Sequence, residues 1–124
     1  MKQLFLALVF CLLLPVAVTP ATYDAPVRHI NVGKVDVTKY CLNGKLTSSD
    51  KVVYRGCIAL SRDLIKKHHL KFGDKVIIPG IGVFWFDDWM PPQWKGRVDI
   101  HEPNYKKAKD FGRLKNQTLI IVKR

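Results

Sequence analysis

The chain has 124 residues and a formal net charge of +11, with 21 lysines and arginines against 10 acidic residues. This length is enough for one compact domain with a hydrophobic core and too short for two. The positive charge favours polyanionic partners such as nucleic acid, anionic lipid or the anionic polymers of a cell envelope.

The N-terminal segment has the layout of a secretory signal peptide. One lysine, Lys2, precedes an apolar run from Leu4 to Val18, which is short for a membrane span of about 20 residues. We expect residues 1–21 to be removed after Ala21 and the protein to be exported to the periplasm, the cell envelope or the medium. An uncleaved N-terminal anchor is the alternative, and it would be the protein's contact with the membrane. Export makes an envelope polymer the expected partner, and nucleic acid is not expected.

The remainder predicts a β-rich domain over residues 33–124, preceded by a leader of residues 22–32. Short runs with alternating apolar and polar residues are typical of half-buried strands. Strands are expected, in chain order, at Gly33–Cys41, at Val53–Leu60, on both sides of a turn at Pro79–Gly80, in Arg97–Glu102 and in Thr118–Arg124. Helices are expected in "SRDLIKKHH", with Ser61 as N-cap, and in "PNYKKAKDFGR", which should end near Gly112.

This order of elements indicates a closed barrel. Six short strands with two short helices, and without a strand–helix–strand rhythm, favour a mainly β barrel over a parallel sheet. Cleavage would leave two cysteines, Cys41 and Cys57, and an even pair in an exported chain predicts a disulfide. His68 and His69 are adjacent and do not have the spacing of a zinc site, so we expect neither a metal nor a cofactor.

Five stretches occur in an order that resembles a known family. "VTKYC", "CIALS", "KFGDKVIIPGIGVFWFDD", "KGRVDI" and "AKDFGR" are similar to the 3D domain, which is named for three aspartates. The resemblance extends from about Val35 to Val122 and includes the catalytic barrel of membrane-bound lytic transglycosylase A and the resuscitation-related wall proteins. It implies a double-psi β-barrel that acts on peptidoglycan.

The resemblance also implies site residues. Asp88 and Asp99 match the second and third aspartates of the family, and the pair Lys95–Gly96 lies between them. The position of the first aspartate is occupied by Ser61, and "WMPPQW" replaces the family's glycine-rich stretch. By resemblance, Asp99 is the catalytic acid, Asp88 assists it, and Lys95 stabilises charge or contacts an anionic peptide stem.

The residues themselves are consistent with this chemistry. In "RVDIHE", Val98 and Ile100 alternate with Asp99, so a core-facing apolar pair would place Asp99 on the open face. Glycan cleavage needs a carboxylic acid with a raised pKa, and Trp89, Met90 and Trp94 can supply an apolar wall and a stacking platform for sugar rings. Asp87 is expected at the surface, and His101 is expected to be exposed.

Three functions are therefore considered. The first is an exported lytic transglycosylase that cleaves peptidoglycan strands with one carboxylate and leaves anhydro ends; a hydrolase would need a second carboxylate. The second is a non-catalytic glycan-binding barrel, as in expansin-like proteins. The third is a nucleic-acid-binding protein, which only the charge suggests.

Overall fold

The structure is a computed structural model that describes residues 12–17 and 25–124. The expected signal peptide lies largely outside the described residues, and its described part, residues 12–17, has no regular secondary structure. Among the described residues, none of the helices has the length and apolar character needed to span a bilayer.

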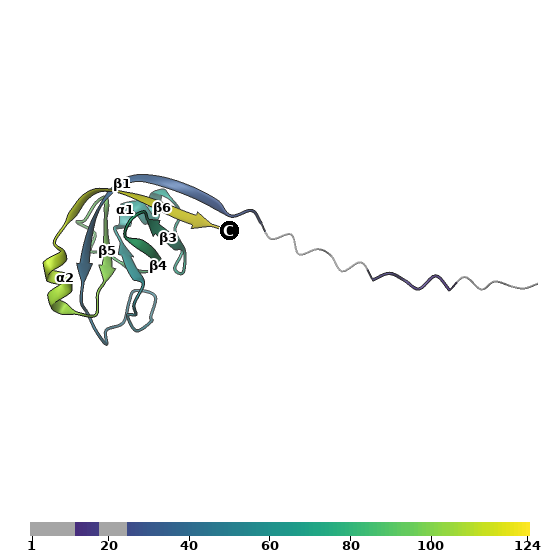
Figure 1. The fold of residues 1–124 in the computed structure, drawn as a ribbon, viewed down its shortest axis with the longest axis horizontal. Helices are drawn as coiled ribbons and strands as arrows, with labels where there is room; N and C mark the ends of the chain where they lie inside the picture. The colour runs from purple at the N-terminus through teal and green to yellow at the C-terminus, as the bar shows by residue number, and fades with distance from the viewer. Residues whose placement is uncertain (1–11, 18–24) are drawn as a thin grey trace, which may run out of the picture.

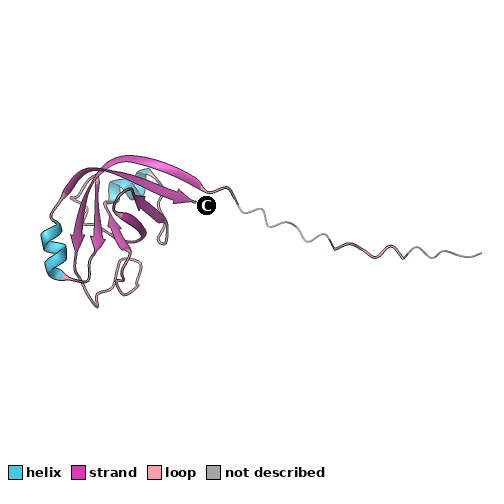
Figure 2. Ribbon diagram, viewed as in Figure 1, coloured by secondary structure: helices cyan, strands magenta, loops and turns pink. Residues whose placement is uncertain are grey.

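Six strands and two helices make up the domain (Figures 1 and 2). They are β1 (Arg28–Tyr40), β2 (Cys57–Leu60), α1 (Arg62–Lys67), β3 (Lys75–Ile78), β4 (Gly82–Trp89), β5 (Arg97–His101), α2 (Tyr105–Phe111) and β6 (Leu114–Lys123). The elements expected from the sequence are all present. The main differences are at three strand starts. β1 starts at Arg28, within the expected leader, because its first residues pair with the end of β6. β6 starts at Leu114 and not at Thr118, because its first residues also pair with β1. β2 starts only at Cys57, because residues 53–56 end a loop.

The strands form a closed barrel in the order β1-β5-β2-β4-β3-β6. Two of the pairings, β1 with β5 and β2 with β4, are parallel, and the other four are antiparallel. Parallel neighbours require crossover connections, and the segment with α1 and β3 is the crossover between β2 and β4. The expectation of a mainly β, six-stranded barrel with two helices is confirmed.

The barrel interior is filled by aliphatic side chains and one phenylalanine. Val98 and Ile100 of β5 point inward, as their alternation with Asp99 predicted. Phe86 of β4 is the largest of the side chains that are almost completely buried. Burial of each such side chain contributes roughly 1.5–3 kcal/mol. The core cluster consists of Val35, Val37, Ile58, Leu60, Leu64, Leu70, Val76, Ile78, Phe86, Val98, Ile100, Leu119 and Ile121.

Ser61 precedes α1 and Gly112 follows α2, as the sequence indicated, whereas α1 ends at Lys67 and is shorter than expected. Asn104 precedes α2, and its side chain accepts a hydrogen bond from the backbone N–H of Lys107. Gly112 ends α2 with a φ of 65°, a conformation that favours glycine. Ser61 is the N-cap of α1, but its hydroxyl accepts from Arg97 N instead of capping the helix. Ser61 therefore ties α1 to β5.

The expected disulfide between Cys41 and Cys57 is not formed. Cys41 Sγ lies 3.3 Å from the carbonyl oxygen of Pro103, whereas Cys57 Sγ lies 3.7 Å from the hydroxyl of Tyr40. The reason is topological: Cys41 directly follows β1, Cys57 is the first residue of β2, and β5 lies between these two strands. Two strand spacings separate backbones by about 10 Å, and a disulfide needs α-carbons within about 7 Å.

Candidate functional site

A row of four residues crosses four neighbouring strands and brings the two predicted site aspartates together. Thr38 of β1 is opposite Asp99 of β5, Asp99 is opposite Ala59 of β2, and Ala59 is opposite Asp88 of β4. Residues paired in this way project to the same face of a sheet. Asp88 and Asp99 are therefore two strand spacings apart, roughly 9.5 Å between backbones, and only the small side chain of Ala59 lies between them. We call this set the carboxylate row.

A β-bulge in β4 gives Asp88 its place in the row. The register passes from Ile58 opposite Phe86 to Ala59 opposite Asp88, so Asp87 is the extra residue. In a regular strand Asp87 would be the partner of Ala59. A bulge of this kind redirects a side chain, and bulges are common next to functional sites.

The carboxylate row forms part of a pocket of about 140 Å³. Both aspartates line it, as does the small side chain that separates them. Loop residues complete the wall on one side, and the segment after β4 completes it on the other. The lining residues are Tyr40, Leu42, Ala59, Asp88, Trp89, Met90, Pro91 and Asp99.

The environment of Asp99 favours the protonated form of its carboxyl group. Burial raises its pKa above the ordinary value of 3.8, and the negative charge of Asp88 acts in the same direction. A hydrogen bond of 2.9 Å from the Thr38 hydroxyl and the charge of Arg97 act against this shift without cancelling it. The bond from Thr38 goes to Oδ1, and Oδ2 has no hydrogen-bond donor among residues 25–124. This second oxygen is available to a ligand in the pocket.

Asp88 makes a full set of hydrogen bonds to the protein. Its Oδ1 accepts from the backbone N–H of Ser48 at 3.0 Å, from the Ser48 hydroxyl at 2.7 Å and from the backbone N–H of Trp89 at 2.9 Å. Its Oδ2 accepts from the Tyr40 hydroxyl at 3.3 Å. Asp88 thus anchors the β1–β2 loop, residues 41–56, and forms the wall of the pocket opposite Asp99.

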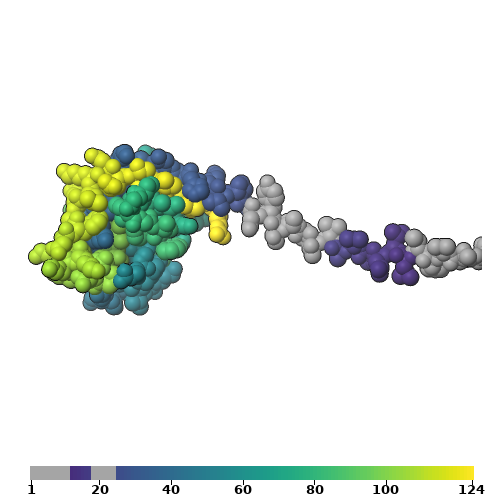
Figure 3. Space-filling view, in the orientation of Figure 1, coloured from purple at the N-terminus to yellow at the C-terminus, as the bar shows by residue number. Residues whose placement is uncertain are grey.

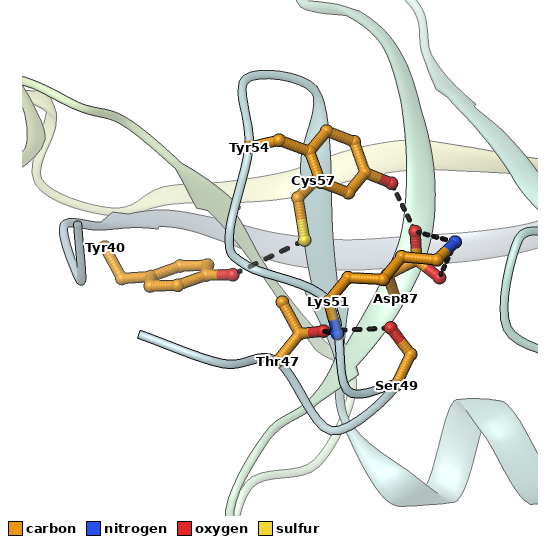
Figure 4. Close-up of polar contacts among 7 residues, drawn as sticks. All are labelled: Tyr40, Thr47, Ser49, Lys51, Tyr54, Cys57 and Asp87. Carbon is orange, nitrogen blue, oxygen red and sulfur yellow. Dashed lines mark hydrogen bonds and ion pairs between the residues drawn. The ribbon is translucent and has the colours of Figure 1, made fainter. Parts of the chain in front are cut away.

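Asp87 is buried, which corrects the expectation that it lies at the surface. Only 1% of the residue is exposed, and its carboxylate accepts hydrogen bonds from Tyr54 and, at 3.4 Å, from Lys51 (Figure 4). Its backbone oxygen also accepts from Ser49 N. Asp87 and Asp88 therefore hold the same loop from adjacent positions.

The aromatic residues of "WMPPQW" occupy separate places. Trp89 lines the pocket with 46% of its surface exposed, and its ring stacks on Phe72 with centroids 5.6 Å apart. Met90 is buried in the pocket wall. Trp94 lies outside the lining, 4.1 Å from the guanidinium of Arg97, and Lys95 is exposed and also outside it. The pocket thus contains one of the two predicted tryptophans.

Tyr40 lines the pocket, although the sequence assigned it no role. The signal that could have indicated it is its place in "VTKYC", one of the stretches that carry the family resemblance. Burial raises the pKa of its hydroxyl, so it remains a hydrogen-bond donor to Asp88 at neutral pH. Its ring lies 5.5 Å from the ring of His101. His101 is buried rather than exposed, since Tyr40 packs against it, and burial lowers the pKa of its imidazole.

The residues near the missing first aspartate have structural partners. Asp63 Oδ2 accepts from the backbone N–H of Gly96 at 3.0 Å, which fixes the segment that leads into β5. Burial alone would raise the pKa of Asp63, but hydrogen bonds from Ser61 and from backbone amides outweigh it and lower the pKa. These contacts lie beside the pocket and not in its lining.

In the part of the chain that the structure describes, His, Cys, Asp and Glu side chains form no cluster of three or more that could hold a metal. No protein-family model matches the chain, and no curated protein matches it in sequence.

Proposed function

We propose that this protein is an exported, peptidoglycan-cleaving enzyme, a lytic transglycosylase in which Asp99 is the acid and base. One observation carries the proposal: a carboxyl group with a raised pKa and one open oxygen lines a pocket beside an exposed indole. General acid catalysis on a glycosidic oxygen requires a carboxyl that is protonated near neutral pH. The Trp89 ring offers an apolar face on which a sugar ring can stack.

The reaction requires one carboxyl group in two successive roles. Asp99 first gives its proton to the glycosidic oxygen, the bond to the anomeric carbon breaks, and the leaving sugar departs with a new hydroxyl. The Asp99 carboxylate then takes the proton from the 6-hydroxyl of the remaining sugar, whose oxygen bonds to the anomeric carbon. The product is a 1,6-anhydro end, and Asp99 is protonated again.

The hydrogen bonds of Asp88 favour this route over hydrolysis. A hydrolase needs a second carboxylate as nucleophile or as base for water. Three donors converge on Oδ1 of Asp88 and one reaches Oδ2, so both of its oxygens are held by protein donors and are not free to bind an attacking water. Asp88 is suited to orient the loop and to keep a negative charge near the developing positive charge of the sugar.

The test is digestion of purified peptidoglycan, followed by mass spectrometry of the soluble products. The wild type should release muropeptides with anhydro ends, and Asp99→Asn should release none while it still sediments with the sacculi. Asp110→Asn, a change of an exposed carboxylate on α2, is the matched control and should retain full activity. Reducing ends in place of anhydro ends would show hydrolysis and would give Asp88 an essential role.

A non-catalytic glycan-binding barrel is the second candidate. Ser61 in place of the family's first aspartate favours it, because Ser61 is buried and its hydroxyl binds Arg97 N. Binding to sacculi without soluble products from the wild type, under conditions where a known muralytic enzyme works, would select this candidate.

A further inference from the structure

A second hollow, of about 550 Å³, lies where the start of β1 meets the end of β6. Figure 3 shows these two segments together at the surface, the first in blue and the second in yellow. The residues that line the hollow differ from those that line the carboxylate pocket. His29 of the hollow and Tyr40 of the pocket lie near opposite ends of β1, roughly 35 Å apart along the strand.

The floor of the hollow is a row of cross-strand partners. His29 is opposite Val122, Val122 is opposite Lys75, and Lys75 is opposite Trp85. Partners in register project to one face, so these four side chains line one surface across β1, β6, β3 and β4. Three strand spacings give this row a length of roughly 14 Å.

The hollow carries unpaired positive charge. Lys75 is exposed in its floor and Lys71 at its edge, and within residues 25–124 no side-chain carboxylate lies within ion-pair distance of either lysine. The carboxylate in the hollow, Asp74, accepts from Lys71 N and is paired with Lys123, so it does not neutralise the exposed cations. An anion in the hollow would therefore meet two uncompensated lysine side chains.

Trp85 provides an apolar platform beside these cations. It is 43% exposed, and its ring packs against Gly56, where an added Cβ would lie 3.2 Å from the indole. Gly56 has a φ of +94°, so this backbone position also favours glycine for conformational reasons. One edge of the indole thus packs against Gly56, while 43% of the residue remains exposed to solvent.

We propose that this hollow is a binding site for an anionic saccharide, a sugar ring that carries a carboxylate or a phosphate group. The ring would stack on Trp85, and its anionic group would lie between Lys75 and Lys71. An indole face suits the C–H surface of a sugar, and a neighbouring ammonium group suits its anion. The site is independent of Asp99 and of any reaction in the carboxylate pocket.

The arrangement favours a saccharide over nucleic acid. Binding of single-stranded nucleic acid typically combines a long cationic groove with several aromatic side chains on which successive bases stack. The hollow has one exposed indole and a short row of partners. It matches one or a few sugar units.

The test is a titration of the protein followed by the indole N–H signals in ¹H–¹⁵N NMR spectra, with the Trp85 signal assigned through Trp85→Phe. The probes are oligogalacturonate, which carries carboxylates, and a phosphorylated oligomannoside. Neutral cellopentaose, inorganic pyrophosphate and an oligothymidylate are the comparison ligands. At least one anionic saccharide should shift the Trp85 signal, and the preferred probe identifies the anionic group.

The variants locate the site, and their affinities are measured by isothermal titration calorimetry because the Trp85 variants lack the indole signal. Lys71→Gln combined with Lys75→Gln should weaken saccharide binding about tenfold, as should Trp85→Ala, whereas Trp85→Phe should stay within about threefold. Lys106→Gln, on exposed α2, and Asp99→Asn should bind like the wild type. If Trp85→Ala does not fold, the double lysine variant alone tests whether the saccharide binds in the hollow. The proposal is overturned if that variant binds normally, if pyrophosphate binds as tightly as the saccharides, or if the oligothymidylate shifts Trp85 at lower concentration.

Discussion

Replacing Asp99 with asparagine should make the barrel more stable at neutral pH. Asparagine has the shape of aspartate and retains an oxygen that can accept the hydrogen bond from Thr38. What changes is the charge that the wild type must bury when Asp99 ionises. Because the pKa of Asp99 is raised in the folded protein, the folded state opposes this ionisation.

The size of the effect is set by opposing contributions. The charge-assisted hydrogen bond from Thr38 becomes a neutral one, which costs about 1 kcal/mol, and the attraction of Arg97 is lost. Burial of the carboxylate outweighs both, as the raised pKa shows. We expect a net gain of about 0.5–2 kcal/mol at pH 7, the range for relief of a strained functional group. For a domain of roughly 100 residues, 1 kcal/mol corresponds to about 4–8 °C in Tm.

The pH dependence separates this cause from others. Near and below the ordinary aspartate pKa of 3.8, wild-type Asp99 is protonated and carries no penalty, so the two proteins should have similar stability. As the pH rises through the raised pKa, the wild type loses stability relative to Asp99→Asn. Melting curves by circular dichroism at intervals from pH 4 to pH 7 would measure the difference.

Asp36→Asn is the matched control, with the opposite sign. Hydrogen bonds from Arg113 lower the pKa of Asp36 below its ordinary value of 3.8, so this variant should lose stability at neutral pH. Its deficit should shrink only as the pH falls below 3.8, and its melting curves therefore extend to lower pH than those of Asp99→Asn. A gap between wild type and Asp99→Asn that stayed constant from pH 4 to pH 7 would refute the assignment of Asp99 as a buried carboxyl with a raised pKa.

Two further predictions concern the loop anchors and the cysteines. Asp87→Ala leaves the Tyr54 hydroxyl without its acceptor and should cost about 2–3 kcal/mol in urea unfolding, whereas Asp110→Ala should stay within about 0.5 kcal/mol; equal effects would contradict the anchoring role. At pH 8, iodoacetamide should modify Cys41 faster than Cys57, since Cys57 is buried and burial is the main reason that its pKa is about 11. If neither thiol reacted until a reductant was added, the result would show that Cys41 and Cys57 form a disulfide after all.

The elements of the fold could be predicted because their signals are local. Val98 and Ile100 alternate with Asp99 within five residues, and Pro79–Gly80 marks the β3–β4 turn in the sequence itself. The start of β1 differs because Arg28 and its neighbours become a strand by pairing with β6, at the other end of the barrel sequence. Tertiary pairing decides such boundaries, and a single sequence does not contain that information.

The errors at the site have the same origin. The disulfide required Cys41 and Cys57 to be neighbours, and the insertion of β5 between their strands prevents this. Period-two alternation assigns faces correctly in β5, but it cannot show where a bulge inserts an extra residue into β4. The burial of Asp87 follows from that bulge together with the loop that covers it.

The bulge also explains why Asp99, and neither Asp87 nor Asp88, has a carboxyl oxygen without a protein donor. In a regular strand Asp87 and Asp88 would point to opposite faces, and only one could reach the β1–β2 loop. With the bulge, both carboxylates bind that loop, Asp87 through Lys51 and Tyr54 and Asp88 through Ser48. The loop is then a fixed wall, and the oxygens of its two anchors are occupied by protein donors. Asp99, across Ala59, keeps an oxygen directed at whatever enters the pocket, so chemistry in this pocket would begin at Asp99.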